Sequence, residues 1–376
     1  MPVRMMECIE REPPRHICVV LLTGLGDVVH GLPVVNALRR AWPDTNVTWV
    51  VEPMPAGILQ PHPSLDQVIV YEKKRGVAGV RDLRRRMARE RFDLAINFNI
   101  YFKSIFPTLF SRAPERWTFG RDRARDGVWL AGNRHLPARP RRHTQDMFLE
   151  FVEVLGVDPY PLEWRLEITA AEREQQARFV DQLGGRRAVA LVPASANVKK
   201  DWPAERYVDV VDAIEIDLGA RAVLVGGPGD REVEAARIIE AEASQQPLWM
   251  MGDGVRRLIW ILDACAAAVA PDTGPLHIAR AVGTPVVGLF GHTNPWRVGP
   301  YRAFEDLWID AYTEPGEGPD PSNFTPKLGR METIEPRAVI EKVERALRSE
   351  HGAAAALDRP HAGRLDRMHG GEGDAR

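Results

Sequence analysis

Short apolar runs alternate with amphipathic stretches along most of the chain, and the alternation occurs in two successive halves. In the first half we predict strands at residues 17–22, 47–51, 67–70 and 94–97, with helices between them, notably at 28–41 and 77–91. Short strands without polar alternation are typical of parallel sheets that helices cover on both faces. The first half therefore predicts one Rossmann-like β/α domain.

The second half repeats the pattern after a helix predicted at residues 170–183. Strands are expected at 189–192, 222–225, 268–270 and 286–290, with a shorter one near 248–250. Residues 156–166 contain two prolines and little periodicity, which indicates a linker. We therefore expect an α/β protein whose two Rossmann-like domains, 1–160 and 161–335, have parallel sheets facing each other across a cleft. A helix is expected at 336–349, and the tail 350–376, poor in core-forming residues, is expected to be disordered.

Length and composition narrow the function. A chain of 376 residues suits two domains, and a net charge of −2 excludes a broadly basic nucleic-acid binder. No 18-residue apolar run is present, and the first residues do not have the pattern of a secretory signal. Cys8, Cys18 and Cys265 lack the spacing of metal ligands, which favours free thiols in a reducing compartment. We expect a cytoplasmic protein whose contact with a membrane is peripheral.

The segment 271–277, Pro-Asp-Thr-Gly-Pro-Leu-His, joins a predicted strand to a predicted helix. Such a loop places the free N–H groups of a helix start at the carboxyl edge of a sheet, where they favour a phosphate. Thr273 can donate a hydroxyl, Gly274 allows close approach of the backbone, and His277 lies one turn further along. The alternative is that Asp272 or Thr273 only caps the helix.

A second strand-end motif, Gly24-Leu25-Gly26-Asp27, follows the first strand. Asp27 can accept a proton from a substrate hydroxyl, or it can serve only as the N-cap of a helix that begins at Val28. His30 follows nearby and either assists or only packs locally. The motif lacks the third glycine of a dinucleotide fingerprint, and Glu52 is the nearest acidic residue, so it predicts NAD binding only weakly.

Three further regions can bind anions or sugars. Lys200 follows the strand at 189–192, in a loop that also offers Ser195, and either contacts a phosphate or is a solvated lysine. In and after the turn 226–230, Asp230 or Glu232 can reach ribose hydroxyls, or the glycines only form a turn. Residues 112–143 contain nine arginines and three acidic residues, which gives a local charge of +6. This charge suits an anionic acceptor or an anionic membrane, or the segment is only a solvated surface. Neither an Asp-x-Asp triplet nor a P-loop occurs.

Six segments occur in an order that resembles glycosyltransferase family 9, the ADP-heptose:lipopolysaccharide heptosyltransferases. They are Gly26–Pro33, Trp49–Glu52, Lys200–Pro203, Asp272–His277, Gly288–Pro295 and Gly299–Tyr301. The resemblance covers about residues 16–349. It departs from the family at Gly31, where threonine is usual, and at 97–102, which replaces an Asp-x-Gln-Gly-like segment.

The resemblance implies a GT-B fold and an inverting transfer that requires no metal or other cofactor. It assigns the general base to Asp27, a donor-phosphate contact to Lys200, and the nucleotide diphosphate and sugar to the group Asp272, Thr273, Gly274 and His277. With the loops above, Ser195 and Glu232 complete the expected donor side. Lys103 and Ser104, together with Gly26 and His30, form the expected acceptor side. The helix at 336–349 is expected to cross back to the first domain.

The sequence thus predicts a glycosyltransferase that moves a heptose or related sugar from an ADP-sugar to a lipopolysaccharide core or similar anionic glycan. Its expected partners are this donor, a glycolipid acceptor and the inner face of the inner membrane, with no nucleic acid. Two alternatives remain open at this point: a sugar-nucleotide epimerase of GT-B fold, and a non-catalytic protein that binds nucleotide sugars. A nicotinamide-dependent dehydrogenase ranks last.

Overall fold

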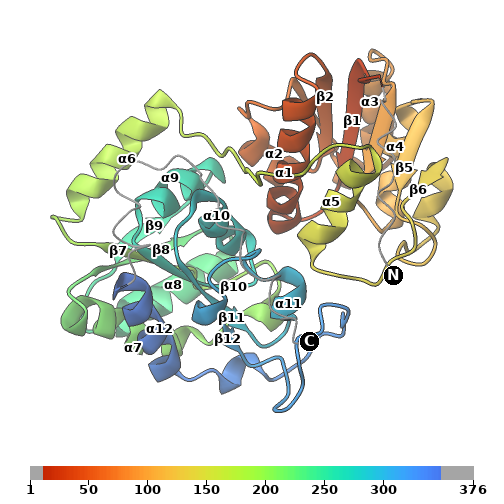
Figure 1. The fold of residues 1–376 in the computed structure, drawn as a ribbon. Helices are drawn as coiled ribbons and strands as arrows, with labels where there is room; N and C mark the ends of the chain where they lie inside the picture. Colours follow the sequence, from red (N-terminus) through yellow and green to blue (C-terminus); the bar gives the residue numbers. More distant parts are fainter. Residues whose placement is uncertain (1–11, 349–376) are drawn as a thin grey trace, which may run out of the picture.

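The structure is a computed structural model that describes residues 12–348. Each half of the chain contains one six-stranded, fully parallel sheet (Figure 1). The N-terminal strands are β1 (His16–Leu21), β2 (Asn46–Val51), β3 (Gln67–Val70), β4 (Leu94–Asn97), β5 (Glu115–Thr118) and β6 (Arg134–His135). Their order in the sheet is β3-β2-β1-β4-β5-β6. The sequence predicted the first four, whereas β5 and β6 lie in the arginine-rich region 112–143, where we predicted no strand.

The helices of the N-terminal half cover both faces of its sheet. They are α1 (Leu25–Ala41), α2 (Pro53–Ala56), α3 (Gly76–Met87), α4 (Ile105–Phe110) and α5 (Thr144–Val154), with short turns η1 (Gly57–Leu59), η2 (Lys73–Arg75), η3 (Phe102–Ser104) and η4 (Val128–Ala131). Alternate residues of β1 belong to two different apolar clusters, one on each face of the sheet. Because both faces are buried, the central strands β1, β2 and β4 are apolar at most positions, which is the pattern from which they were predicted.

The C-terminal half repeats this architecture with the sheet order β12-β11-β10-β7-β8-β9. Its strands are β7 (Ala188–Leu191), β8 (Arg221–Gly226), β9 (Leu248–Met251), β10 (Ala267–Pro271), β11 (Val286–Phe290) and β12 (Ile309–Asp310). Its helices are α6 (Ala170–Gln182), α7 (Ala204–Asp212), α8 (Asp230–Glu242), α9 (Arg256–Ala264), α10 (Gly274–Val282), α11 (Pro295–Val298) and α12 (Pro336–Arg348), with turns η5 (Val198–Lys200), η6 (Ala213–Asp217), η7 (Glu305–Leu307) and η8 (Met331–Thr333). The expected fold class, two Rossmann-like parallel sheets, is therefore confirmed.

The last helix does not have the position that we expected for residues 336–349. Instead of crossing to the N-terminal domain, α12 packs against α7, β10 and β11 of its own domain. Val339 and Val343 are fully buried there, in the same cluster as Trp202 of the C-terminal domain. The apolar stripe of α12 is thus used to cover the sheet to which it is connected. The expected tail, 350–376, lies outside the described residues.

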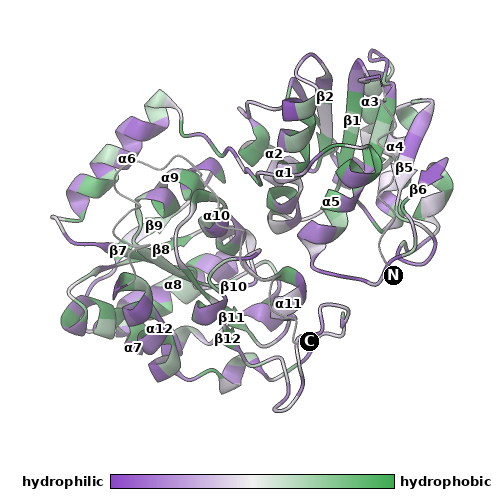
Figure 2. Ribbon diagram, in the orientation of Figure 1, coloured by the Kyte–Doolittle hydropathy of each residue, from purple (hydrophilic) through white to green (hydrophobic). Residues whose placement is uncertain are grey.

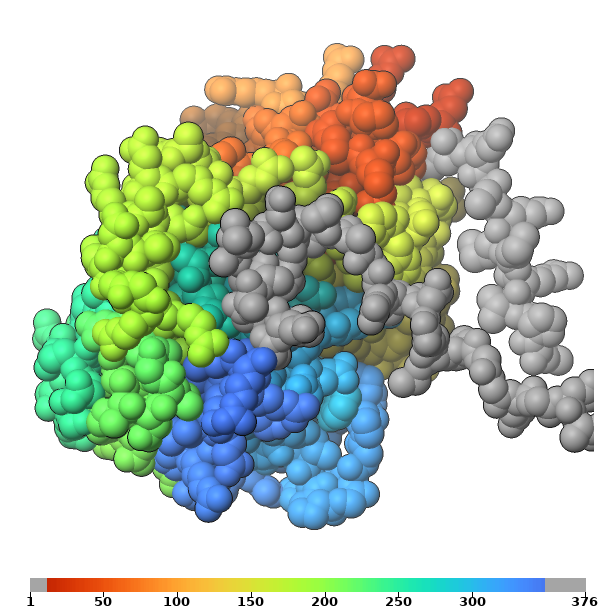
Figure 3. Space-filling model, turned by 60° about the vertical axis from the view of Figure 1, so that its left-hand side comes forward, coloured from red at the N-terminus to blue at the C-terminus, as the bar shows by residue number. Residues whose placement is uncertain are grey.

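The segment between α5 and α6 joins the two domains, and the boundary expected at residue 160 falls within it. It lies against the N-terminal domain, as the yellow-green segment next to the red and orange surface in Figure 3 shows. The Arg40 guanidinium donates hydrogen bonds to the carbonyl oxygens of Asp158 and Tyr160, at 2.9 and 2.8 Å. These hydrogen bonds hold the connecting segment against the C-terminal end of α1.

Hydropathy follows this architecture. The central strands of the C-terminal domain are largely hydrophobic, whereas hydrophilic residues recur along the outer helix α6 (Figure 2). Between residues 12 and 348, we find no helix with the length and hydrophobicity needed to span a bilayer.

Candidate functional site

A cavity of about 730 Å³ lies between the two domains. The N-terminal domain contributes the start of α1, and the C-terminal domain contributes loops at the carboxyl ends of β7, β8, β9 and β10. This is the edge at which parallel α/β sheets bind their ligands. The cavity brings together most of the expected site residues: Gly26, Asp27, His30, Ser195, Lys200, Glu232, Asp272, Thr273, Gly274 and His277.

Two helix starts, one from each domain, meet at this cavity. The backbone of Gly26 in the first turn of α1 lies against the ring of His277 in α10, since a Cβ added at Gly26 would be 2.5 Å from His277 Cδ2. A Cβ added at Gly274 would similarly lie 2.5 Å from Leu25 Cδ2. Only residues without a side chain allow this approach, so the two glycines set the spacing of the domains at the site. Both helices point their unpaired N–H groups, and their positive ends, at the cavity.

Asp272, at the end of β10, links the donor-side residues. One carboxylate oxygen, Oδ2, is 2.7 Å from Lys200 Nζ, and the other, Oδ1, is 3.3 Å from His277 Nε2. Burial alone would raise the pKa of this carboxyl, but Lys200 and His277 outweigh that effect and hold the pKa well below the ordinary range. Asp272 is therefore ionised, and it orients one lysine and one imidazole at the edge of the cavity.

Thr273 occupies the N-cap position of α10, but its side chain makes no capping hydrogen bond. Its Oγ1 is buried and has no partner among the described residues, although the residue lines the cavity. The interpretation of Thr273 as only a helix cap is therefore wrong. A buried hydroxyl without a partner is costly unless a ligand supplies an acceptor, and a phosphate oxygen is a suitable one. The helix ends at Gly283, whose φ of +83° favours glycine.

Asp27 lies inside the first turn of α1, because the helix begins at Leu25 and has Gly24 as its N-cap. The alternative that Asp27 caps a helix starting at Val28 is therefore wrong. Asp27 lines the cavity opposite the donor-side residues. Burial raises its pKa, an effect that Arg297 and His277 partly offset. A carboxylate with a raised pKa is a stronger base, which suits proton abstraction from a hydroxyl.

Three histidine rings gather beside Asp27. His30 lies 4.4 Å from His277 and 5.3 Å from His143, measured between ring centroids. Burial lowers the pKa of His143 to about 4, and it holds that of His30 well below its ordinary value, so both are neutral near pH 7. His30 Nδ1 is 3.1 Å from Gln145 Oε1, while its Nε2 is buried and has no hydrogen-bond partner among residues 12–348. Within residues 12–348, we find no group of three or more His, Cys, Asp or Glu placed to hold a metal ion.

The remaining donor-side residues lie on loops that line the cavity. Ser195 Oγ bonds to the Asn197 carbonyl and to Asp201, both at 2.8 Å, so its hydroxyl shapes the loop that carries Lys200. Glu232 lies in the first turn of α8, where its carboxylate accepts a hydrogen bond from the Gly227 N–H at 3.3 Å. Asp230, the other acidic residue considered there, does not line the cavity.

Two expected acceptor-side residues lie outside the cavity. Ser104 is fully buried, and its Oγ is bonded to Asn97 Nδ2 and the Tyr101 carbonyl, so its assignment to acceptor binding is wrong for this conformation. Lys103 Nζ is 2.9 Å from Glu52 Oε1, which Lys73 also contacts at 2.8 Å. Glu52, the acidic residue considered for NAD binding, is therefore already engaged in two ion pairs.

Gly31, where the family usually has threonine, packs on Trp49. The Trp49 ring would be 2.8 Å from a Cβ added at Gly31.

The cavity also contains residues that the sequence analysis missed. Arg297 of α11 lines it, as do Met54 and the loop 252–255 after β9. Arg297 follows an apolar strand and an Asn-Pro helix start, a pattern that marks a strand-end loop of the same kind as the others. It was missed because a lone arginine beside tryptophan has no specific motif.

Comparison with known proteins is consistent with this geometry. Residues 80–311 match the family model described as glycosyltransferase family 9 (heptosyltransferase). The chain is 31% identical over 304 residues to the lipopolysaccharide core heptosyltransferase OpsX of Haemophilus influenzae, covering 81% of this chain and 86% of that protein. Its fold is similar to that of a family 9 glycosyltransferase from Veillonella parvula, with a TM-score of 0.75, 24% identity, and coverage of 89% of this chain and 97% of that one. It is also similar in fold to the E. coli heptosyltransferase WaaC, solved with ADP, with a TM-score of 0.68, 20% identity, and coverage of 88% and 99%.

Proposed function

Because the chain belongs to glycosyltransferase family 9, the heptosyltransferase family, we propose that it transfers heptose from ADP-heptose to a lipopolysaccharide core acceptor with inversion at the anomeric carbon. The proposal rests on one observation. A single cavity has the Asp27 carboxylate on one side and the linked group Lys200, Asp272 and His277, with the free Thr273 hydroxyl, on the other. The relatives named for lipopolysaccharide core transfer, and the one solved with ADP, support the choice of acceptor and donor.

On the donor side, the start of α10 binds the diphosphate. Its N–H groups and the Thr273 hydroxyl donate to phosphate oxygens, and Gly274 allows the backbone to approach them. Lys200 contributes a positive charge while Asp272 holds it in place. As the bond between the anomeric carbon and the diphosphate oxygen breaks, negative charge develops on the leaving ADP. These fixed groups stabilise that charge without reorganising.

On the acceptor side, Asp27 takes the proton of the attacking hydroxyl. The hydroxyl oxygen forms a bond to the anomeric carbon as the bond to ADP breaks on the opposite face, so the configuration inverts. A base in this position contributes about 10²- to 10⁴-fold to the rate. Donor and acceptor bound next to the contact of α1 with α10 would displace water from the cavity, which limits hydrolysis of the donor.

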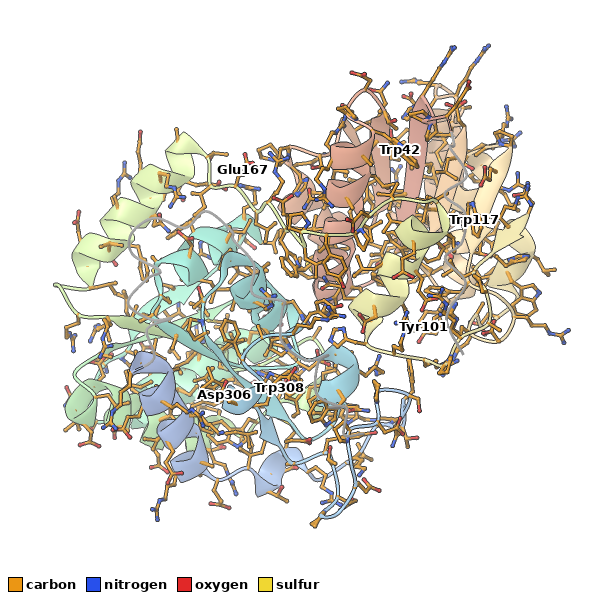
Figure 4. All side chains as sticks on the ribbon, viewed as in Figure 1. Trp42, Tyr101, Trp117, Glu167, Asp306 and Trp308 are labelled. Atoms are coloured by element: carbon orange, nitrogen blue, oxygen red, sulfur yellow. The ribbon has the colours of Figure 1, made fainter. Side chains whose placement is uncertain are left out.

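We further propose that the enzyme reaches its acceptor from an anionic membrane. Four exposed apolar side chains lie on neighbouring elements: Tyr101 and Phe102 at η3, Leu109 on α4 and Leu130 in η4. Because α4 contacts both η3 and η4, we treat these side chains as one apolar face. Figure 4 places Tyr101 at the lower edge of the N-terminal domain. The arginines at 112, 121, 125 and 134, in the same part of the N-terminal domain, are exposed and complement anionic lipid headgroups. Arg123 of the same region is instead buried, and it pairs with buried Glu150 at 2.8 Å.

Calorimetric titration with ADP-, UDP- and GDP-sugars tests the donor. We expect binding of ADP-heptose, and equal affinity for all three nucleotides would contradict the proposal. Transfer to lipopolysaccharide from a heptose-deficient strain tests the acceptor, and NMR of the new linkage tests inversion. Activity should persist in EDTA, because the proposed reaction requires no metal ion.

Sedimentation with phosphatidylglycerol vesicles tests the membrane contact. Phe102→Ser with Leu130→Ser should reduce it, whereas Val180→Ser, at an exposed position on α6, serves as the control.

A further inference from the structure

Arg297 is a cation at the cavity for which the proposed reaction, as described, has no use. It lines the cavity together with Asp27, and its Nε is buried without a hydrogen-bond partner. Within residues 12–348 its side chain forms no ion pair and no hydrogen bond, and its guanidinium carbon lies 4.5 Å from the centroid of the Phe324 ring. The Nε–H group of Arg297 has therefore lost hydration without gaining an acceptor, and an oxyanion in the cavity would supply one.

A second arginine lies over the same ring. Arg141, from the segment that precedes α5 in the N-terminal domain, has its guanidinium carbon 4.5 Å from the Phe324 centroid. It too forms no ion pair and no side-chain hydrogen bond within the described part of the chain. Two arginines from different domains thus converge on one aromatic ring, an arrangement that we call the arginine–phenylalanine stack (Arg141, Phe324 and Arg297). Two like charges this close repel each other, so an anion is favoured between or beside them.

The position of the stack is fixed by the loop that carries it. Asn294 caps α11 by accepting a hydrogen bond from the Trp296 N–H at 3.0 Å. The same side chain donates to the carbonyl oxygens of Asp320 and Asn323, at 2.7 and 3.0 Å. Asn294 therefore ties the start of α11 to the segment that contains Phe324. The backbone positions from which Arg297 and Phe324 extend are thus held relative to each other, which reduces the reorganisation needed when a ligand binds.

The stack lies on the acceptor side of the cavity. Arg297 and Asp27 line the same cavity, where burial raises the pKa of the Asp27 carboxyl and the positive charge of Arg297 acts in the opposite direction and lowers it. The groups assigned to the donor diphosphate come from other loops, and Lys200 among them is already paired with Asp272. Arg141 does not line the cavity. The pair therefore extends from the Asp27 side of the cavity outward.

We propose that Arg297 and Arg141 bind an oxyanion of the acceptor, a carboxylate or a phosphate, and so place the adjacent hydroxyl at Asp27. This rests on the proposed glycosyl transfer for the identity of the acceptor. It makes the stack an element of specificity, because an acceptor without a negative charge next to its nucleophilic hydroxyl would leave Arg297 unpaired.

The test separates acceptor binding from donor binding and from turnover. Arg297→Gln, Arg297→Lys and Arg141→Gln are compared with Arg139→Gln, a control in the same segment whose arginine already pairs with Glu153 at 3.0 Å. ADP affinity is measured by calorimetry. Acceptor affinity is measured by surface plasmon resonance on captured heptose-deficient lipopolysaccharide, and KM for that acceptor by transfer from ADP-heptose. Two treated acceptors, one with amidated carboxyl groups and one dephosphorylated, distinguish the two sources of the oxyanion.

We expect Arg297→Gln to weaken acceptor binding and raise the acceptor KM about 10- to 100-fold, with ADP affinity within about 3-fold of wild type. Arg297→Lys should recover part of the loss, because it keeps the charge but not the planar guanidinium. The treated acceptor that has lost the recognised oxyanion should bind the wild-type protein poorly, and Arg297→Gln should not weaken its binding further. Weaker ADP binding with an unchanged acceptor KM would overturn the proposal, as would an acceptor affinity equal to that of Arg139→Gln. Surface plasmon resonance measures acceptor binding directly, so the role of the stack is tested even if the protein transfers no heptose.

Discussion

Gly26 and His277 touch across the boundary between the two domains: a Cβ on Gly26 would lie 2.5 Å from the imidazole Cδ2. One residue belongs to α1, which carries the proposed base, and the other to α10, which carries the proposed phosphate-binding groups. This contact therefore sets the distance between the group that activates the acceptor and the groups that hold the donor.

Gly26→Ala should displace His277 or force the two domains apart. Because a small misplacement of reacting groups is costly, we expect kcat to fall by about 10- to 100-fold while the melting temperature changes little. Gly24→Ala is the comparison, since an added Cβ there meets nothing within 4 Å, and its effect should be much smaller. Equal losses in the two variants would show that the spacing is not set at Gly26.

Asp27→Ala should lower kcat by about 10²- to 10⁴-fold with nearly unchanged affinity for ADP, because the carboxylate acts on the acceptor and not on the nucleotide. Single-turnover transfer and calorimetry measure the two quantities separately. Full activity in this variant would remove Asp27 from the role of base.

The pH dependence of kcat/KM should report the same carboxyl. Burial raises the pKa of Asp27, so activity should fall with decreasing pH at a midpoint above the ordinary aspartate value of about 3.9. Arg297 opposes that rise, so Arg297→Gln should move the acid limb to still higher pH. A limb that moves down, or that is absent, would contradict this account.

Thr273→Val should weaken ADP binding by about 10-fold or more, since it removes a hydrogen bond to a charged ligand. It should leave the free energy of unfolding nearly unchanged, because the hydroxyl has no partner among the described residues. Thr284→Val is the opposite case. Its hydroxyl donates to the Leu262 carbonyl at 2.7 Å, so this change should lower stability and leave ADP affinity intact.

His143 should make the protein less stable in mild acid. In the folded state Nδ1 accepts the Gln145 N–H, Nε2 lies 3.0 Å from the Gly299 carbonyl, and burial lowers the pKa to about 4. Between this value and the unfolded value of about 6.5, the unfolded chain binds more protons, so stability falls as pH falls. From pH 7 to pH 5 the loss should be about 2 kcal/mol from this residue. Urea unfolding of His143→Gln should show a smaller pH effect than wild type, with exposed His135→Gln as the control.

The sequence predicted most of the elements because buried parallel strands are recognisable from their composition alone. Strands β3, β4 and β11 were predicted with the bounds that the structure has. The edge strands β6 and β12 and the short strand β5 were missed, since residues such as Arg134 and Asp310 carry no apolar pattern. The start of α1 was placed three residues late because glycines 24 and 26 were interpreted as a turn.

By itself, the sequence determined which residues end the strands, and hence that Asp27, Lys200 and the segment 272–277 lie at the ligand-binding edges of two sheets. Local chemistry is sufficient for this, because strand ends and helix starts are set by neighbouring residues. Only the tertiary structure decided which strand-end residues meet. It brought Arg297, Phe324 and Arg141 together, buried Ser104, occupied Lys103 with Glu52, and attached α12 to its own sheet. These outcomes depend on packing between residues far apart in the chain, which no local pattern records.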